Sequence, residues 1–264
     1  MLTPMPDVSG EVDRESVRPI YDEIGIGYAS RRTSDPRIFA CIRTALSSCA
    51  TVLNVGAGAG SYEPPTCIMA VEPSQRMIEQ RPPGIARCIR AVAEHLPLAD
   101  KSFDGSLASM TIHHWKDVRA GLAEMRRVTR KRMVLFTWDP EFEANYWLMR
   151  DYFPAILELD RPRFPTLRAL EAMLHRIDVQ TVPISADCQD GFIGAFWKRP
   201  EAFLDPDVVR GNSAMAQLDP QKLQDGIGRL RADLRTGAWL RRNPHLAAQN
   251  ELDLGYRLVI SDQI

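Results

Sequence analysis

The sequence predicts an α/β fold in which helices cover both faces of a mostly parallel sheet. Three observations support this class. Short apolar runs alternate with helical patterns through the first half of the chain, a glycine-rich loop follows the first run, and residues 133–138 are uncharged and, apart from Thr137, apolar. Alternating strands and helices favour a parallel sheet, because each parallel crossover needs a long connection. A nearly continuous apolar strand is typical of a sheet that is buried on both faces.

The composition fits one globular unit of this kind and excludes several classes of protein. Of 264 residues, 45% are apolar and 25% are charged, and the net charge is −1, which is ordinary for a globular chain. The basic residues are scattered, whereas nucleic-acid binders gather them into a patch. No apolar run approaches the roughly 20 residues of a membrane span, and Met1–Gly10 lacks the features of a signal peptide. We expect a cytoplasmic protein without nucleic-acid or membrane partners, and the oligomeric state stays open.

The five cysteines do not indicate a disulfide framework or a metal site. Their number is odd, and no CxxC pair occurs among them. Zinc sites and disulfide-rich domains show paired, regularly spaced cysteines. We therefore expect free thiols and no metal.

The elements of the first half follow in order. Asp35-Pro36 supplies a helix cap and a proline at the first helical position, which predicts a helix over 36–49. Residues 1–12 read as a tail, and 13–30 as a helix followed by an irregular segment. Further strands are expected at 51–55, 67–71, 86–92, 104–110 and 133–138, with helices at 74–80 and 117–130.

The second half departs from this alternation. Glu141–Arg163 is rich in aromatic residues, and a helix (165–176) and a strand (179–185) follow it. A long amphipathic helix begins after Asp219-Pro220, and 256–261 is a final strand. The complete prediction is a Rossmann-like, doubly wound, mostly parallel seven-stranded sheet with helical insertions that form a lid. The expected units are an N-terminal cap segment (1–34), a core (35–140, 164–185 and 255–264) and helical substrate-cap insertions (141–163 and 186–254).

The glycine loop and one acid point to an adenosine-containing ligand. Gly56-Ala57-Gly58-Ala59-Gly60 follows the first strand, and glycine lets the backbone approach a ligand closely. Glu72 ends the second strand, where a carboxylate can accept hydrogen bonds from both ribose hydroxyls of an adenosine. This pattern suits a dinucleotide and also S-adenosylmethionine.

Four stretches carry a resemblance to a known family. They are VLNVGAGAG (52–60), AVEPS (70–74) with Met77, AEHLPLADKSFD (93–104) and SMTIHHW (109–115). In order and spacing they resemble the motifs of class I S-adenosylmethionine-dependent methyltransferases, in the small-molecule, methyltransferase type 11 (UbiE-like) branch. The resemblance implies S-adenosyl-L-methionine as cofactor and S-adenosyl-L-homocysteine as product.

Residue by residue, the resemblance places the glycines at the amino-acid end of the cofactor, Glu72 at the ribose, and Met77, Ala93 and Glu94 at the adenine. An N-terminal Tyr or Arg often reaches the cofactor carboxylate in relatives; the alternative is that these residues only pack or are solvated. The full implied set of cofactor-binding residues is Tyr21, Tyr28, Arg32, Asn54, Gly56, Ala57, Gly58, Gly60, Glu72, Pro73, Met77, Ala93, Glu94 and Ser109.

Two departures from the family pattern stand out. Asn54 occupies a position where an acid is commoner in the family. The connection between the glycine loop and the second strand consists only of residues 61–66, which include Pro64-Pro65. This connection is too short for the usual crossover helix. We expect a compressed turn here, which favours S-adenosylmethionine over NAD.

Methyl transfer from a sulfonium requires alignment of donor and acceptor and, for some acceptors, removal of one proton. His114, and after it His113, are candidate bases because they follow the fourth strand and imidazole titrates near neutral pH. The alternative is that either histidine packs or contacts the cofactor. His95, His175 and His245 are expected to be structural.

The acceptor is expected to be a small molecule. The Asn-Pro-Pro-Tyr-like motif of enzymes that methylate base nitrogens is missing after the fourth strand. Aromatic residues of the insertions could form a lid over an apolar pocket, although each could instead close the core. The predicted substrate-binding residues are Trp138, Tyr146, Trp147, Phe192 and Trp197.

Two other functions stay open at this stage. A nicotinamide-dependent oxidoreductase shares the glycine loop and the ribose acid. A non-catalytic S-adenosylmethionine-binding protein could use 186–254 as a partner surface. A methyltransferase acting on a small acceptor, such as a secondary metabolite, accounts for the most motifs; the methylated atom cannot be read from the sequence.

Overall fold

The computed structural model describes residues 19–142 and 146–262. Residues 1–18 of the predicted N-terminal cap segment, 143–145 of the first insertion and the last two residues of the predicted core lie outside the described residues.

A seven-stranded sheet forms the centre of the molecule, in the order β3-β2-β1-β4-β5-β9-β6. Neighbouring strands are parallel except at β9, which runs antiparallel to β5 and β6. The predicted fold class is therefore confirmed. The strands are β1 (Val52–Val55), β2 (Cys67–Val71), β3 (Arg87–Ile89), β4 (Phe103–Ser109), β5 (Thr129–Trp138), β6 (Asp178–Thr181) and β9 (Tyr256–Asp262).

Helices cover both faces of the sheet, because β5 carries buried apolar side chains on both of its faces. Val134 and Phe136 belong to one hydrophobic cluster, and Met133 and Leu135 to the other, because successive side chains of a strand point to opposite faces. Three helices cover the sheet: the first packs with the first cluster, which also continues into helices described below, and the other two pack with the second cluster. In that order they are α3 (Pro36–Ala45), α5 (Val118–Val128) and α7 (Leu167–Leu174).

Polar caps set the start of these helices. The side chain of Asp35 accepts a hydrogen bond from the Arg37 amide, as its predicted capping role requires, and Asp117 and Thr166 cap α5 and α7 in the same way. The helix predicted over 36–49 ends earlier than expected, at Ala45.

The order of the strands places the carboxyl ends of β1 and β4 at a switch point. The chain runs outward from β1 to β3 and then crosses to β4 on the other side of β1. Ligands of open α/β sheets bind in the crevice at such a point. The connection between β1 and β2 contains only turns, so the compressed turn predicted over 61–66 is confirmed.

The strand predicted over 179–185 is instead divided, which corrects that prediction. Its first part is β6, whereas β7 (Ile184–Ser185) pairs with β8 (Glu251–Leu252) in a separate two-stranded sheet. Pro183 lies between them. Proline has no N–H to continue a ladder, so the chain leaves the main sheet there.

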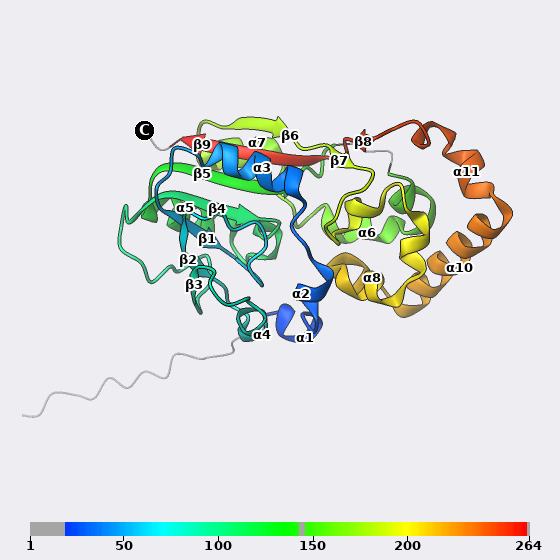
Figure 1. The fold of residues 1–264 in the computed structure, drawn as a ribbon, viewed down its shortest axis with the longest axis horizontal. Helices are drawn as coiled ribbons and strands as arrows, with labels where there is room; N and C mark the ends of the chain where they lie inside the picture. Colours follow the sequence, from blue (N-terminus) through cyan, green and yellow to red (C-terminus); the bar gives the residue numbers. More distant parts are fainter. Residues whose placement is uncertain (1–18, 143–145, 263–264) are drawn as a thin grey trace, which may run out of the picture.

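Short helices from two regions of the chain form a cap beside the sheet, seen at the right of Figure 1. Asp219 caps the longest of them, α10, by accepting from two backbone amides. Trp147 packs edge-on against Trp239 and Phe203 in the interior of the cap. The cap helices are η2 (Leu148–Tyr152), α6 (Pro154–Asp160), η3 (Ile193–Phe196), η4 (Pro200–Leu204), α8 (Pro206–Gly211), α9 (Ser213–Ala216), α10 (Pro220–Thr236), α11 (Ala238–Arg242) and η5 (Pro244–Leu246).

The N-terminal segment lies where the sheet and the cap meet. Helix α1 (Tyr21–Ile24) contacts α4 (Gln75–Glu79), which follows β2, and α2 (Tyr28–Arg31) contacts α8 of the cap. Figure 1 shows both short helices below the junction. Within residues 19–142 and 146–262, no helix is both long and apolar enough to cross a membrane.

Candidate functional site

A cavity of about 1160 Å³ lies at the carboxyl ends of β1, β2 and β4. Its volume slightly exceeds the roughly 300–1,000 Å³ of ordinary small-molecule sites. The cavity brings together every residue predicted to bind the cofactor except Gly60. These lining residues are Tyr21, Tyr28, Arg32, Asn54, Gly56, Ala57, Gly58, Glu72, Pro73, Met77, Ala93, Glu94 and Ser109.

The glycine loop adopts a backbone that other residues would not tolerate. Gly56 has φ +68°, and a Cβ there would lie 2.1 Å from Oγ1 of Thr111. Gly58 has φ +52° and directs its amide inward to Glu72. Gly60, with φ +98°, serves the turn instead, since a Cβ there would meet Ile85 at 2.4 Å. Both the left-handed backbone and the close packing require glycine.

Glu72 is held rigidly at the edge of this cavity. One carboxylate oxygen accepts from the Gly58 amide at 2.8 Å, and the other accepts from the Ser74 amide at 2.9 Å. Burial raises the pKa of Glu72, and the two amide donors oppose that rise. The side chain is thus fixed in one orientation beside a space that a ribose could fill.

Asn54 contributes a buried acceptor with no partner. Its amide nitrogen donates to Glu63 at 3.1 Å, while Oδ1 has no hydrogen-bond partner among the described residues. Such a group is costly to leave unpaired, so it points to a donor on a ligand. Glu63 in turn forms a buried ion pair with Arg81 at 2.8 Å. An acid near the glycine loop is therefore present, but it comes from residue 63, which the motif gave no reason to select.

The segment that follows β3 lines part of the cavity. Ala93 and Glu94 line it, and Glu94 accepts from the backbone amides of Lys116 and Asp117 at 2.7 and 3.2 Å. Glu94 thereby ties this wall to the start of α5.

Tyr21, Tyr28 and Arg32 line the cavity. The Arg32 side chain is only 11% exposed and is therefore not solvated, and contact of these residues with a cofactor carboxylate stays a prediction. Arg32 makes a two-point contact with Asp190 of the cap at 2.6 and 3.2 Å and donates to the Tyr28 hydroxyl at 2.7 Å. The Tyr62 hydroxyl donates to the same Asp190 carboxylate at 2.7 Å.

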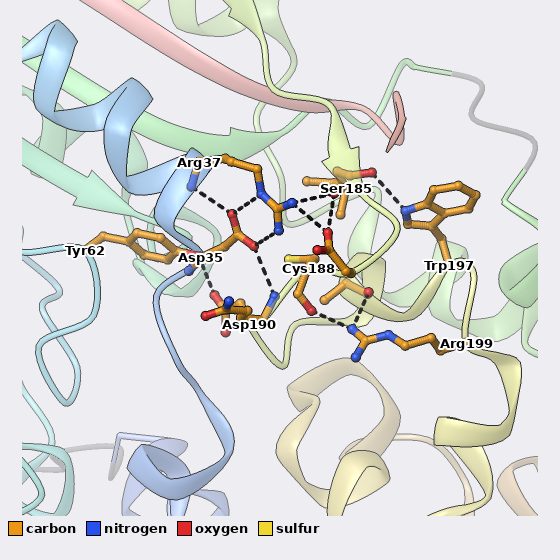
Figure 2. Close-up of polar contacts among 12 residues, drawn as sticks. Asp35, Arg37, Tyr62, Ser185, Cys188, Asp190, Trp197 and Arg199 are labelled. Atoms are coloured by element: carbon orange, nitrogen blue, oxygen red, sulfur yellow. Dashed lines mark hydrogen bonds and ion pairs between the residues drawn. The ribbon is translucent and has the colours of Figure 1, made fainter. Parts of the chain in front are cut away.

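Asp35 extends this network to the cap (Figure 2). Besides capping α3, it binds the guanidinium of Arg37 and accepts from the Gln189 amide at 3.1 Å. Arg37 also donates to Asp187 at 2.6 Å. The glycine-loop side, the N-terminal segment and the cap are thus joined through two buried aspartates. Sequence analysis missed Asp190 because its partners are more than a hundred residues away.

A second, smaller cavity of about 70 Å³ adjoins the first, on the side of the cap. Four residues line both cavities and mark the boundary between them: Tyr21, Arg32, Met110 and His114. Of the predicted substrate-binding residues, Trp138 and Phe192 line the smaller cavity. Its polar lining includes Asp160, Arg163 and Asn212.

The other three predicted substrate-binding residues lie in the core of the cap. Tyr146 donates to the Ile193 carbonyl, and the indoles of Trp147 and Trp197 donate to backbone carbonyls at 2.7 and 2.9 Å. All three are buried and lie outside both cavities. We correct their assignment to packing of the cap, because their polar atoms are already satisfied there.

His114 lies at the boundary and His113 lines the smaller cavity, but both imidazoles are poorly suited to accept a proton. Burial, with the charge of Arg163, lowers the pKa of His114 to about 4. Burial, with His114 and Arg163, also holds the pKa of His113 well below its usual range. His113 stacks on Phe164 with ring centroids 3.9 Å apart, and its Nδ1 is buried without a partner in the described part of the chain. Both imidazoles are neutral at pH 7.

His95, His175 and His245 line neither cavity. All five cysteines are free, and no group of three or more His, Cys, Asp or Glu side chains within 19–142 and 146–262 is arranged to hold a metal ion.

Comparisons with known proteins agree with this geometry. A family model described as a methyltransferase domain matches residues 53–137. The crystal structure of a protein described as a methyltransferase from an antibiotic biosynthesis pathway of Anabaena variabilis is 32% identical, with a TM-score of 0.82; the match covers 88% of this chain and 98% of that one. The [4+2]-cyclase SpnF is 14% identical and matches over 94% of each chain with a TM-score of 0.55, which shows a shared fold alone. No curated protein matches the sequence.

Proposed function

The chain belongs to the class I S-adenosylmethionine-dependent methyltransferases, and on that premise we propose that it methylates a small molecule held in the smaller cavity. The observation that carries this proposal is the pair of adjoining cavities. The larger has the volume and the lining that the cofactor needs, and the smaller meets it at the boundary formed by Tyr21, Arg32, Met110 and His114.

The residues present fit the cofactor. Glycines keep the cradle free of Cβ atoms, the unpartnered Oδ1 of Asn54 can accept from an ammonium group, and Glu72 is oriented to accept from hydroxyls. When bound, S-adenosylmethionine supplies an electrophilic methyl group on a sulfonium. The chain itself contributes a rigid cradle and a boundary that aligns the acceptor, and alignment is the main requirement of such a displacement.

A secondary metabolite is the class of acceptor that we favour. The relative that is 32% identical is described as part of an antibiotic biosynthesis pathway. The lining of the smaller cavity mixes aromatic rings, among them Trp138 and Phe192, with a few polar groups, as small-molecule sites do. Since about 70 Å³ holds little more than two waters, the cavity accommodates the reacting end of an acceptor rather than an entire extended molecule.

The proposed division into core and cap follows from the same arrangement, with the cap supplying the acceptor side. The role of His114 as a base stays a prediction, which its low pKa weakens. The cytoplasmic location and the lack of nucleic-acid partners also stay predictions.

The experiment that tests the proposal has two steps. Calorimetric titration with S-adenosylhomocysteine, NAD and NADP should show micromolar binding of the first alone. Transfer of labelled methyl groups should then reach phenols, amines or thiols of low molecular mass but not DNA, RNA or protein. Binding of a nicotinamide cofactor alone would overturn the proposal, and binding of S-adenosylhomocysteine with transfer only to a macromolecule would contradict the acceptor class.

A further inference from the structure

Asp160 lies at the last position of α6 and lines the smaller cavity. Within 19–142 and 146–262, its carboxylate forms no hydrogen bond and no ion pair. Its backbone carbonyl, by contrast, accepts from the amides of Arg163 and Phe164 and so holds the residue in place. The nearby Arg163 directs one guanidinium nitrogen to Gln217 at 3.0 Å instead. A carboxylate that faces a cavity without a partner is available to a ligand.

The electrostatic surroundings leave Asp160 as the strongest base in this cavity. Burial raises the pKa of Asp160 to about 6, and the charge of Arg163 limits the rise. The two imidazoles have depressed pKa values and are neutral, burial raises the pKa of both tyrosines, and Arg32 is neutralised by Asp190. The other titratable residues that line the cavity are Tyr21, Arg32, His113, His114, Arg163 and Tyr256.

We propose that Asp160 binds the acceptor and removes its proton, so that the acceptor is a small molecule with a hydroxyl or amino nucleophile. This inference rests on the proposed function and adds the acceptor class and the base. A base whose pKa lies near the working pH is suited to proton transfer, and a neutral imidazole with a pKa near 4 is a weaker one.

A lone pair of the acceptor oxygen or nitrogen forms the new bond to the methyl carbon, and the electron pair of the broken carbon–sulfur bond stays on sulfur. The O–H or N–H bond of the acceptor breaks, and its proton passes to the ionised carboxylate of Asp160. No oxidant, reductant or metal is needed. A carbon or thioether nucleophile has no O–H or N–H proton to transfer to Asp160.

The test compares two variants of one helix. Asp160→Asn keeps the shape and the backbone contacts but removes the base, whereas Glu158→Gln makes the same chemical change at an exposed position of α6 outside both cavities. Methyl transfer is measured with phenols and primary amines between pH 5 and 9. The rate should rise with pH to a plateau, with a midpoint near 6, because only the ionised carboxylate accepts a proton. In Asp160→Asn the rate should fall about 10²- to 10⁴-fold and the midpoint should disappear, while Glu158→Gln should match the wild type.

A readout independent of turnover completes the test. In the complex with S-adenosylhomocysteine, carbon NMR of labelled aspartate should show one carboxyl that titrates near pH 6 and is absent from Asp160→Asn. Phenol or benzylamine should perturb that signal. The inference is overturned if Asp160→Asn keeps the wild-type rate and pH profile, or if neither probe perturbs the signal and neither is methylated. If the wild-type protein does not bind S-adenosylhomocysteine, the proposed function itself is contradicted.

Discussion

The phenol oxygen of Tyr21 lies 3.1 Å from Nε2 of His114, across 93 residues of sequence. The contact joins α1 to the 3-10 helix η1 (Ile112–His114), and both residues line both cavities. Burial raises the pKa of Tyr21 and lowers that of His114, so the phenol keeps its proton and the imidazole is neutral. The contact is therefore a hydrogen bond between two neutral groups, whose donor is set by the tautomer of His114. The N-terminal segment thus completes the boundary between the two cavities.

The first prediction concerns the pH dependence of stability. An unfolded chain protonates His114 below about pH 6.5, whereas the native imidazole stays neutral down to about 4. The unfolded state therefore binds more protons in that window, and the free energy of unfolding falls as the pH drops from 6.5 to 4. The contribution of His114 is at most about 3 kcal/mol.

Comparison with His114→Gln isolates this contribution, because Asp160, which has the opposite pH dependence, is present in both proteins. Urea unfolding at pH 6.5 and 4.5 should show a smaller loss of stability in the variant than in the wild type. An equal loss in both proteins would mean that His114 titrates normally in the native state.

The second prediction concerns Glu72. Glu72→Ala should weaken S-adenosylhomocysteine binding about ten- to hundredfold, because hydrogen bonds to a charged group contribute about 1.5–3 kcal/mol. Calorimetry measures the effect. Glu171→Ala on the exposed side of α7 is the matched control and should bind like the wild type. Full affinity in Glu72→Ala would remove the ribose assignment.

The third prediction concerns the glycine loop. Gly56→Ala should lower the free energy of unfolding by at least about 1–2 kcal/mol, since φ +68° strains an alanine and its Cβ would collide with Thr111. Gly228→Ala is the control: it lies in α10, and a Cβ there meets nothing within 4 Å. That substitution should stabilise by about 0.5–1 kcal/mol. Urea denaturation measures the change in the free energy of unfolding, which should be negative for Gly56→Ala and positive for Gly228→Ala. An unchanged free energy in Gly56→Ala would show that the loop relaxes freely.

The fourth prediction concerns the link between the N-terminal segment and the cap. Asp190→Asn leaves the Arg32 guanidinium, whose side chain is only 11% exposed, without its counter-charge. The expected loss of stability is about 3 kcal/mol, typical of breaking one partner of a buried pair. Asp187→Asn, whose side chain is 81% exposed, should have little effect because its pair with Arg37 is solvated. Equal melting temperatures for the two variants would argue against a stabilising role for the Arg32–Asp190 pair.

Local pattern alone was enough to predict the sheet and the cofactor cradle. The apolar run of β5, the Asp35 cap and the glycine loop each depend on residues that are close together in the sequence. The structure that they form can therefore be predicted from the sequence. The break in the strand predicted over 179–185 also has a local cause, since Pro183 lacks an N–H. The separate pairing of β7 with β8, however, depends on a segment that is distant in the sequence.

The acceptor side could not be predicted in this way. Trp138, Phe192 and Trp197 look alike in sequence, yet only the first two line the smaller cavity, because the cap turns the third toward the Ile184 carbonyl. Asp160 resembles any exposed acid in a helix until the cap buries it beside Arg163. The histidines look like ordinary bases until burial lowers their pKa values.

The sequence by itself therefore determined the fold class, since glycines, caps and strand ends act over short stretches of backbone, and its resemblance to a family identified the cofactor. Only the tertiary structure decided which side chains line the smaller cavity and which of them are charged. Both depend on burial by elements that are distant in the chain, and burial sets the cost of ionisation.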